Sequence, residues 1–255
     1  MTAFAICLLA GLSTALGGLL VALQRHPSER FLAASLGFSA GVMLYISFVE
    51  LLPEGVDGLE EAGLASADIW GPVAFFGGVL LIALIDKFVP DDINPHEEPH
   101  APADGARMRK VGVMAALAIA IHNFPEGFAT FFVALQDPVL AAPIAIAIAI
   151  HNIPEGIAVA VPLRQATGKK WTAAGWAALS GLAEPLGAVI GYLFLRPFLG
   201  PTALGVTYAV IAGIMVFVSL DKLLPTAIET GKHHSAIYGL IGGMAVMALS
   251  LALLG

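Results

Sequence analysis

The chain has 255 residues, of which 58% are hydrophobic and only 12% are charged. Soluble globular domains carry roughly 25% charged residues, so this composition excludes that class and favours a membrane protein with several spans. The net charge of −7 argues against a basic surface for nucleic acid. The single cysteine, Cys7, excludes a disulfide framework and a thiolate metal site.

The apolar residues fall into eight stretches, each long enough to cross a bilayer as a helix, which takes about 20 residues. Unpaired backbone groups are too costly in hydrocarbon, so such stretches should be helical. We therefore predict an all-α integral membrane protein with eight transmembrane helices, forming one polytopic domain over residues 1–255. The predicted spans are residues 2–23, 31–53, 69–89, 111–134, 139–161, 172–195, 203–225 and 236–254.

The basic residues are divided unevenly between the two sets of connections. Eleven of the twelve lie in or beside the connections after the first, third, fifth and seventh spans, and only Arg196 lies on the other side. The connection after the second span is acidic and contains Glu54, Asp57, Glu60, Glu61 and Asp68. Because short basic loops stay in the cytoplasm, we predict both termini outside, and a flexible cytoplasmic loop over residues 90–110.

Parts of the chain repeat with an offset of 172 residues. Residues 40–47 resemble residues 212–219, and the Leu-Leu-Pro at 51–53 matches that at 223–225. Spans 1–3 therefore resemble spans 6–8. Since the first set begins outside and the second begins inside, we predict inverted repeats, with spans 4 and 5 as a central inverted pair, as in many transporters. Met43 and Met215, at matched positions, are interpreted as packing residues.

A six-residue motif occurs twice, as His-Asn-Phe-Pro-Glu-Gly at 122–127 and His-Asn-Ile-Pro-Glu-Gly at 151–156. Ionisable side chains inside a membrane are costly and are functional by default. In each copy His and Glu are four residues apart and Asn and Glu are three apart, so the three share one helix face. The predicted metal ligands from the two copies are His122, Asn123, Glu126, His151, Asn152 and Glu155.

The two copies are predicted to meet at one depth in the membrane. His122 lies about 11 residues into its span, or ~17 Å at ~1.5 Å per residue. His151 lies about 12 residues into the next span from the opposite surface, or ~18 Å. Both depths are about half of a ~30 Å hydrocarbon core. Pro125 and Pro154 should each remove one backbone hydrogen bond and open space beside the motif.

A third carboxylate, Glu184, is predicted near mid-membrane and is followed by Pro185. The corresponding position in the first span is Thr14, so the fold does not require an acid there. A lone carboxylate in hydrocarbon would protonate or pair, whereas a bound cation would keep it ionised. Imidazole and carboxylate ligands without a thiolate suit Zn²⁺, Fe²⁺, Mn²⁺ or Co²⁺ rather than Cu⁺.

These seven candidate ligands are enough to hold two adjacent metal ions bridged by Glu126 and Glu155. We predict one site that contains histidine and, beside it, a second site of amide and carboxylate oxygens. The first would consist of His122, Glu126, His151 and Glu155. The second would consist of Asn123, Glu126, Asn152, Glu155 and Glu184.

The two motifs, the Ser-Gly-Leu-Ala-Glu-Pro-Leu-Gly at 180–187 and the Leu-Leu-Pro at 51–53 resemble the ZIP family of divalent-metal transporters, especially its bacterial zinc uptake branch. The resemblance covers essentially the whole chain. It implies uptake of Zn²⁺, together with Fe²⁺, Mn²⁺, Co²⁺ and Cd²⁺, across the cell membrane into the cytoplasm, with metal as cargo and no cofactor. It also implies the seven ligands above, movement of one helix group against another, and a homodimer.

Two other functions fit part of the pattern. A selective divalent-metal channel could use the same ligands, because a carrier and a pore differ in motion rather than in composition. An intramembrane metalloenzyme is disfavoured, because the zincin motif His-Glu-x-x-His is absent and the order here is His-x-x-x-Glu rather than Glu-x-x-His. We therefore predict a transporter and not an enzyme, with divalent ions and the lipid bilayer as partners and no nucleic acid.

Overall fold

The computed structural model describes residues 2–24, 28–88, 105–136, 138–195 and 200–254, and within these ranges some residues, His122 among them, are described by their backbone alone. All regular secondary structure in these ranges is helical, which confirms the all-α prediction. The elements, with η for a π-helical turn, are α1 (Thr2–Leu23), α2 (Glu29–Ile46), η1 (Ser47–Leu51), α3 (Leu52–Glu61), α4 (Ala67–Phe88), α5 (Gly105–Gln136), α6 (Pro138–Thr167), α7 (Lys170–Gly181), α8 (Ala183–Leu195), α9 (Pro201–Val218), η3 (Ser219–Leu223), α10 (Leu224–Glu229) and α11 (His233–Leu254).

Each predicted span overlaps one helix or a run of consecutive helices. Six segments of the described chain are long and apolar enough to cross a membrane, namely Thr2–Leu23, Glu29–Glu61, Ala67–Lys87, Lys170–Phe194, Pro201–Glu229 and His233–Leu253. The helices α5 and α6, several of whose side chains lie outside the described part of the chain, are not among these six.

The predicted loop over 90–110 falls mostly outside the described residues, because the structure describes nothing between Phe88 and Gly105. α5 begins at Gly105, several residues before the predicted span at 111. A helix satisfies its backbone hydrogen bonds within itself, so it can continue beyond the hydrocarbon layer into water. Apolar content therefore marks the membrane-embedded part of a helix rather than its full length.

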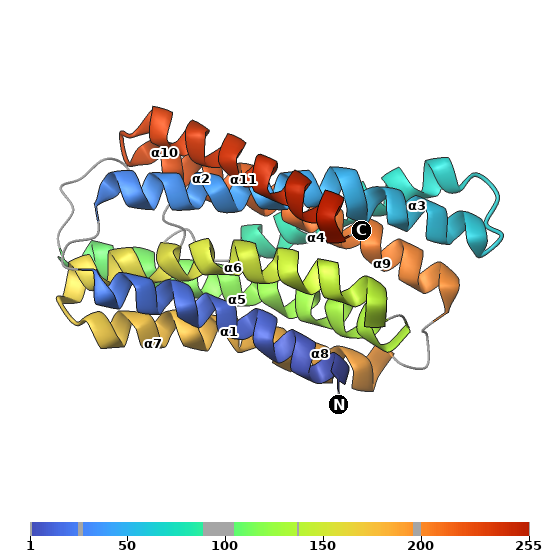
Figure 1. Ribbon diagram of the computed structural model, residues 1–255, viewed down its shortest axis with the longest axis horizontal. Coiled ribbons are helices and arrows are strands. Elements are labelled where there is room, and N and C mark those ends of the chain that lie inside the picture. Colours follow the sequence, from blue (N-terminus) through green and yellow to red (C-terminus); the bar gives the residue numbers. More distant parts are fainter. Residues whose placement is uncertain (1, 25–27, 89–104, 137, 196–199, 255) are drawn as a thin grey trace.

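The helices form two groups that lie side by side (Figure 1). In the first group, α1 packs against α6 and α7, and α5 packs against α6 and α8. In the second group, α2 packs against α11, and α9 packs against α3 and α4. The most extensive contact between the groups joins α2 to α6, and α5 also touches α9. Both copies of the motif therefore belong to helices at the boundary between the two groups.

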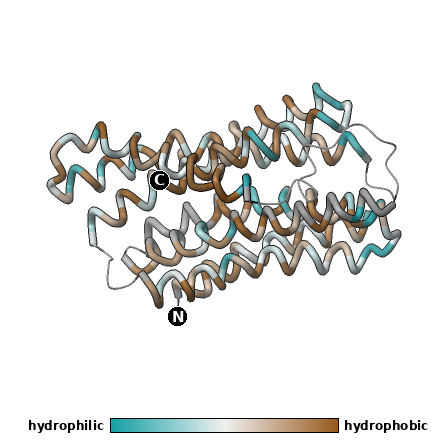
Figure 2. The backbone as a smooth tube through the Cα atoms, turned by 180° about the vertical axis from the view of Figure 1, so that it is seen from behind, coloured by the Kyte–Doolittle hydropathy of each residue, from teal (hydrophilic) through white to brown (hydrophobic). Residues whose placement is uncertain are grey.

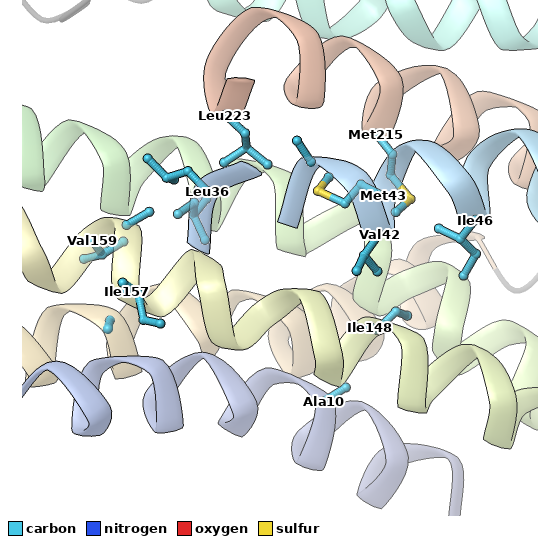
Figure 3. Close-up of a cluster of buried hydrophobic side chains, with 14 of the residues drawn as sticks. Ala10, Leu36, Val42, Met43, Ile46, Ile148, Ile157, Val159, Met215 and Leu223 are labelled. Carbon is cyan, nitrogen blue, oxygen red and sulfur yellow. The ribbon is translucent and has the colours of Figure 1, made fainter. Parts of the chain in front are cut away.

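An apolar core fills this boundary (Figure 3). Val42 and Met43 from α2 lie beside Met215 from α9, and Ile148 and Ile157 from α6 face them from the other group. Met43 and Met215 are both at most 1% exposed, which confirms their interpretation as packing residues. The seam between the two groups is thus largely hydrocarbon, and the polar motif residues are exceptions within it.

The outer surface is apolar as well, as expected for a protein in lipid. Only 22% of the most apolar window of α4 and 17% of that of α11 is buried inside the protein. Exposed side chains on these helices include Phe76 and Leu80 on α4, and Ile241 and Leu249 on α11. Hydrophobic residues follow the length of the helices, and hydrophilic ones gather toward their ends (Figure 2).

The helices α2 and α9 both continue into a π-helical turn, at positions 172 residues apart. Ser47 begins the first turn and its hydroxyl donates to the carbonyl of Met43 over 2.7 Å. Ser219 begins the second and donates to the carbonyl of Met215, also over 2.7 Å. In each case a proline follows shortly after, and the widened turn accommodates a residue that cannot donate a helical hydrogen bond.

The predicted span at 172–195 is interrupted close to its middle. α7 ends at Gly181 and α8 begins at Ala183, with Leu182 between them. Pro185 lies at the start of α8, where its missing N–H is least costly because the first turn has no carbonyl partners. The interruption places Glu184 in the first turn of α8.

Candidate metal centre

The two copies of the motif lie on α5 and α6, which pack against each other, and each helix continues through its internal proline. Six of the seven predicted ligand side chains are described, and every one of them is at most 2% exposed: Asn123, Glu126, His151, Asn152, Glu155 and Glu184. The side chain of His122 lies outside the described part of the structure, and its backbone belongs to α5.

The motif side chains are joined crosswise between the two helices. Nε2 of His151 lies 3.1 Å from Oε1 of Glu126. With the amide of Asn123 oriented to suit its neighbours, Nδ2 donates to Oε2 of Glu155 over 3.2 Å and to the carbonyl of Ile119 over 3.1 Å. Each copy therefore holds the carboxylate of the other, which agrees with the prediction that the motifs meet at one depth.

The third predicted acid, Glu184, belongs to the same cluster. Nδ2 of Asn152 donates to Oε2 of Glu184 over 2.9 Å and to the carbonyl of Ala10 over 3.1 Å. Glu184 also lies within electrostatic range of Glu126 and Glu155. Three carboxylates from α5, α6 and α8 thus gather around the two amides and one imidazole.

Glycines at the end of each motif let neighbouring helices approach this cluster closely. A Cβ on Gly127 would overlap the backbone carbonyl of Glu184, and one on Gly156 would overlap that of Thr14. Glu184 and Thr14 are the corresponding positions of the repeat noted in the sequence. The last motif residue of α5 therefore contacts α8 as that of α6 contacts α1.

The reverse contacts follow the same pattern. A Cβ on Gly187 of α8 would overlap the carbonyl of Phe124, and one on Gly17 of α1 would overlap the carbonyl of Ile153. Phe124 and Ile153 are the third residues of the two motifs. The pair α5 and α8 is thus packed like the pair α6 and α1, but only the first pair brings a carboxylate.

Further polar groups border the cluster, and sequence reasoning did not single them out. Sγ of Cys7 lies 3.5 Å from the carbonyl of Gly127, and the hydroxyl of Ser39 donates to the carbonyl of His151 over 3.3 Å. Thr130 is 1% exposed and lies one turn after Glu126, a spacing that could have identified it. The contacts of Cys7 and Ser39 join distant parts of the chain, so no local pattern indicates them.

The cluster has the chemistry of a cation site. Oδ1 of Asn152 and Oε1 of Glu184 are buried and accept no hydrogen bond from the described residues. Buried carboxylates that face one another repel and have lost their hydration, and a bound cation offsets both costs. Among the described side chains, which leave out His122, no three from His, Cys, Asp and Glu already stand in metal-binding geometry. Amide oxygens or a small inward shift would therefore complete a coordination shell.

Comparison with known proteins identifies the family. The sequence profile of the ZIP zinc transporters matches residues 1–104 and 90–251. The chain is 60% identical to the zinc transporter ZupT of Corynebacterium glutamicum, over 98% of each chain. It is 53% identical to the ZupT of Streptococcus mutans and 48% identical to that of Clostridium perfringens, over at least 96% of each chain.

These matches confirm the resemblance to the bacterial zinc uptake branch. Members of the family are transporters rather than enzymes, so the metalloenzyme alternative is excluded, and zinc is their cargo rather than a cofactor. Together with the apolar helices, the matches identify a multi-pass membrane protein. Over nearly its full length, the chain belongs to the ZIP family of zinc transporters.

Proposed function

We propose that this protein carries Zn²⁺ into the cytoplasm across the cell membrane, through the centre formed by α5, α6 and α8. The observation that carries the proposal is the buried cluster of Glu126, Glu155 and Glu184, joined by His151 and two asparagines. Such a cluster in hydrocarbon is costly without a cation, and its mixed nitrogen and oxygen donors suit zinc. The curated relatives named zinc transporters support this choice of cargo.

We further propose a two-metal centre bridged by Glu126 and Glu155. His122 and His151 would complete the histidine-containing site, and Asn123, Asn152 and Glu184 the oxygen-rich one. The orphan oxygens of Asn152 and Glu184 support the second site, because they face the cluster without a hydrogen-bond donor among the described residues. An oxygen-rich site also tolerates harder ions, so we expect Fe²⁺, Mn²⁺, Co²⁺ and Cd²⁺ to be carried as well.

We propose that α5 and α6 are two further spans, which makes eight with inverted repeats. Two observations support this arrangement. The π-helical turns recur at the same offset of 172 residues, each with the same serine hydrogen bond. The glycine contacts of α5 with α8 also match those of α6 with α1. An axis of pseudo-symmetry between α5 and α6 would account for both.

The proposed orientation has both termini outside. α1 begins and α11 ends toward the same side of the helices, as an even number of spans requires (Figure 1). The basic residues Arg164, Lys169 and Lys170 lie where α6 ends and α7 begins, at the left in that view, whereas the acidic helix α3 lies at the opposite end. The positive-inside rule then assigns the end of α6 to the cytoplasm.

We propose a carrier in which the two helix groups move against each other. The apolar seam between α2 and α6 supports this, because hydrocarbon surfaces can slide without breaking many hydrogen bonds. Ser39 and His151 provide one hydrogen bond across the seam. The homodimer implied by the family resemblance stays a prediction, for which the exposed apolar faces of α4 and α11 are available surfaces.

The test is uptake of radioactive Zn²⁺ into oriented proteoliposomes. Glu126→Gln and Glu155→Gln should each lower uptake at least tenfold, about the loss caused by disturbing even the surroundings of a metal ligand. The matched control is Glu61→Gln, which removes an exposed carboxylate at the end of α3. Uptake that survives both motif substitutions would overturn the proposed centre. Unsaturable flux with single-channel currents would instead identify the channel.

A further inference from the structure

A cavity of about 340 Å³ lies at the end of the helices, away from the metal centre. Its walls come from α5, from the end of α6, and from α7 with the residue before it. The lining residues are Arg109, Leu163, Thr167, Lys169, Thr172 and Trp176. Thr167 follows Glu155 by a stretch of helix on the order of 18 Å long at ~1.5 Å per residue. The cavity is therefore a separate feature from the metal centre.

The charge of the lining is entirely positive. Arg109 and Lys169 both line the cavity, and none of the six lining residues is acidic. Within the described part of the chain neither cation forms an ion pair, whereas Lys222 and Lys232 at the same end do. Two cations that share a cavity without a counter-ion favour the binding of an anion.

The backbone at the same place adds to this field. Gly168, with φ of +67°, turns the chain between α6 and α7. Lys169 then takes the N-cap position of α7 in an extended conformation, and no side chain caps the helix. The amides of the first helical turn have no carbonyl partners within the helix, and the helix dipole is positive at this end. Together these are the features of a phosphate site at a helix N-terminus.

The opposite wall of the cavity is apolar. Leu163 is 3% exposed, and Trp176 is half-buried against the core. Leu179 follows Trp176 by three residues on the same side of α7, and it is exposed on the surface. Trp171, beside Lys170, is also exposed, as tryptophans at a membrane–water boundary are. A ligand with a phosphate and an adjoining hydrocarbon part would match both walls.

We propose that this cavity binds a phosphate group, held by Arg109 and Lys169 and by the first turn of α7. The phosphate can belong to an anionic phospholipid of the facing leaflet or to a small soluble phosphate ester. Basic pockets between spans on the cytoplasmic side are a known place for lipid headgroups. A bound lipid would tie the end of α6 and α7 to the membrane surface, and this does not depend on the metal bound elsewhere.

The test uses the full-length protein in detergent, with lipid binding measured by native mass spectrometry. Phosphatidylglycerol should bind at least about tenfold more tightly than phosphatidylcholine. The double substitution Arg109→Gln with Lys169→Gln should remove that preference. The control double substitution Lys87→Gln with Lys232→Gln removes two cations at the same end of the molecule and should retain it. Equal binding of the two lipids to the native protein would overturn the lipid source.

Inorganic phosphate and glycerol 3-phosphate distinguish the two sources. If either displaces phosphatidylglycerol, or binds alone and is lost in the Arg109 and Lys169 double variant, the site takes soluble phosphates. If neither binds while the lipid preference holds, the source is the membrane. No preference for phosphatidylglycerol together with no phosphate binding would overturn the proposal. The conservative pair Arg109→Lys with Lys169→Arg should retain binding, and equal loss there would also contradict a charge-based site.

Discussion

The imidazole of His151 lies 3.1 Å from the carboxylate of Glu126, so the second motif touches the first across the contact between α5 and α6. The amide of Asn123 makes the reverse connection to Glu155. A side chain that holds a carboxylate in place without filling all of its acceptor positions prepares the site for a cation. The motif is duplicated because each copy positions the acid of the other.

Removal of Glu184 should leave the histidine-containing site and abolish the oxygen-rich one. We expect the wild type to bind two zinc ions per chain and Glu184→Ala to bind one, because Asn152 loses its partner carboxylate and the second ion loses its charge balance. Metal content by mass spectrometry of the purified proteins checks this. Equal stoichiometry in the two proteins would reject the second site while leaving the first.

Gly127→Ala should disturb the centre through the backbone rather than through a ligand. The added Cβ would overlap the carbonyl of Glu184, so α5 and α8 must move apart, at a cost of about 1–3 kcal/mol in stability. Zinc affinity should fall with it. The matched control is Gly175→Ala in α7, where a Cβ meets nothing within 4 Å and should stabilise the helix by about 0.5–1 kcal/mol. Thermal unfolding in detergent compares the two, and a neutral Gly127→Ala would disprove the close packing.

The ion pair of Lys222 should matter more than that of Lys232. Nζ of Lys222 lies 2.8 Å from Asp86 and 3.0 Å from Asp221, and it joins η3 to the end of α4 while only 17% exposed. Lys232 lies 3.6 Å from Glu29 in a more exposed setting. We expect Lys222→Gln to cost about 1–3 kcal/mol and Lys232→Gln less than about 1 kcal/mol. Equal shifts in unfolding temperature would contradict this ranking.

Acid should weaken zinc binding. A carboxylate must be ionised to bind a metal, so protons compete with zinc for Glu126, Glu155 and Glu184 as the pH falls. Affinity should therefore drop several-fold between about pH 7 and about pH 5 and recover on return to neutral pH. Isothermal titration calorimetry in buffers of different ionisation enthalpy would also detect the protons released. An affinity that does not change with pH would exclude carboxylates as the main ligands.

The sequence by itself determined the helices and the identity of the site residues. Each apolar run is helical because a backbone in hydrocarbon must satisfy its hydrogen bonds within its own segment, which is a local requirement. The doubled motif identified Asn123, Glu126, His151, Asn152 and Glu155 for the same reason, because costly residues stand out in an apolar context. The offset of 172 residues likewise located both π-helical turns, although it indicated neither their widened geometry nor the break at Leu182.

Only the tertiary structure decided how these residues meet. The crosswise pairing of the motifs, the contact of Gly127 with Glu184, and the pair of Lys222 with Asp86 all join segments that are far apart in the chain. The side chain of His122 lies outside the described residues, so its place in the centre stays a prediction. Helix formation depends on near neighbours along the chain, whereas these contacts depend on how small residues let whole helices approach one another. That packing is a property of the assembled helices, and no local pattern encodes it.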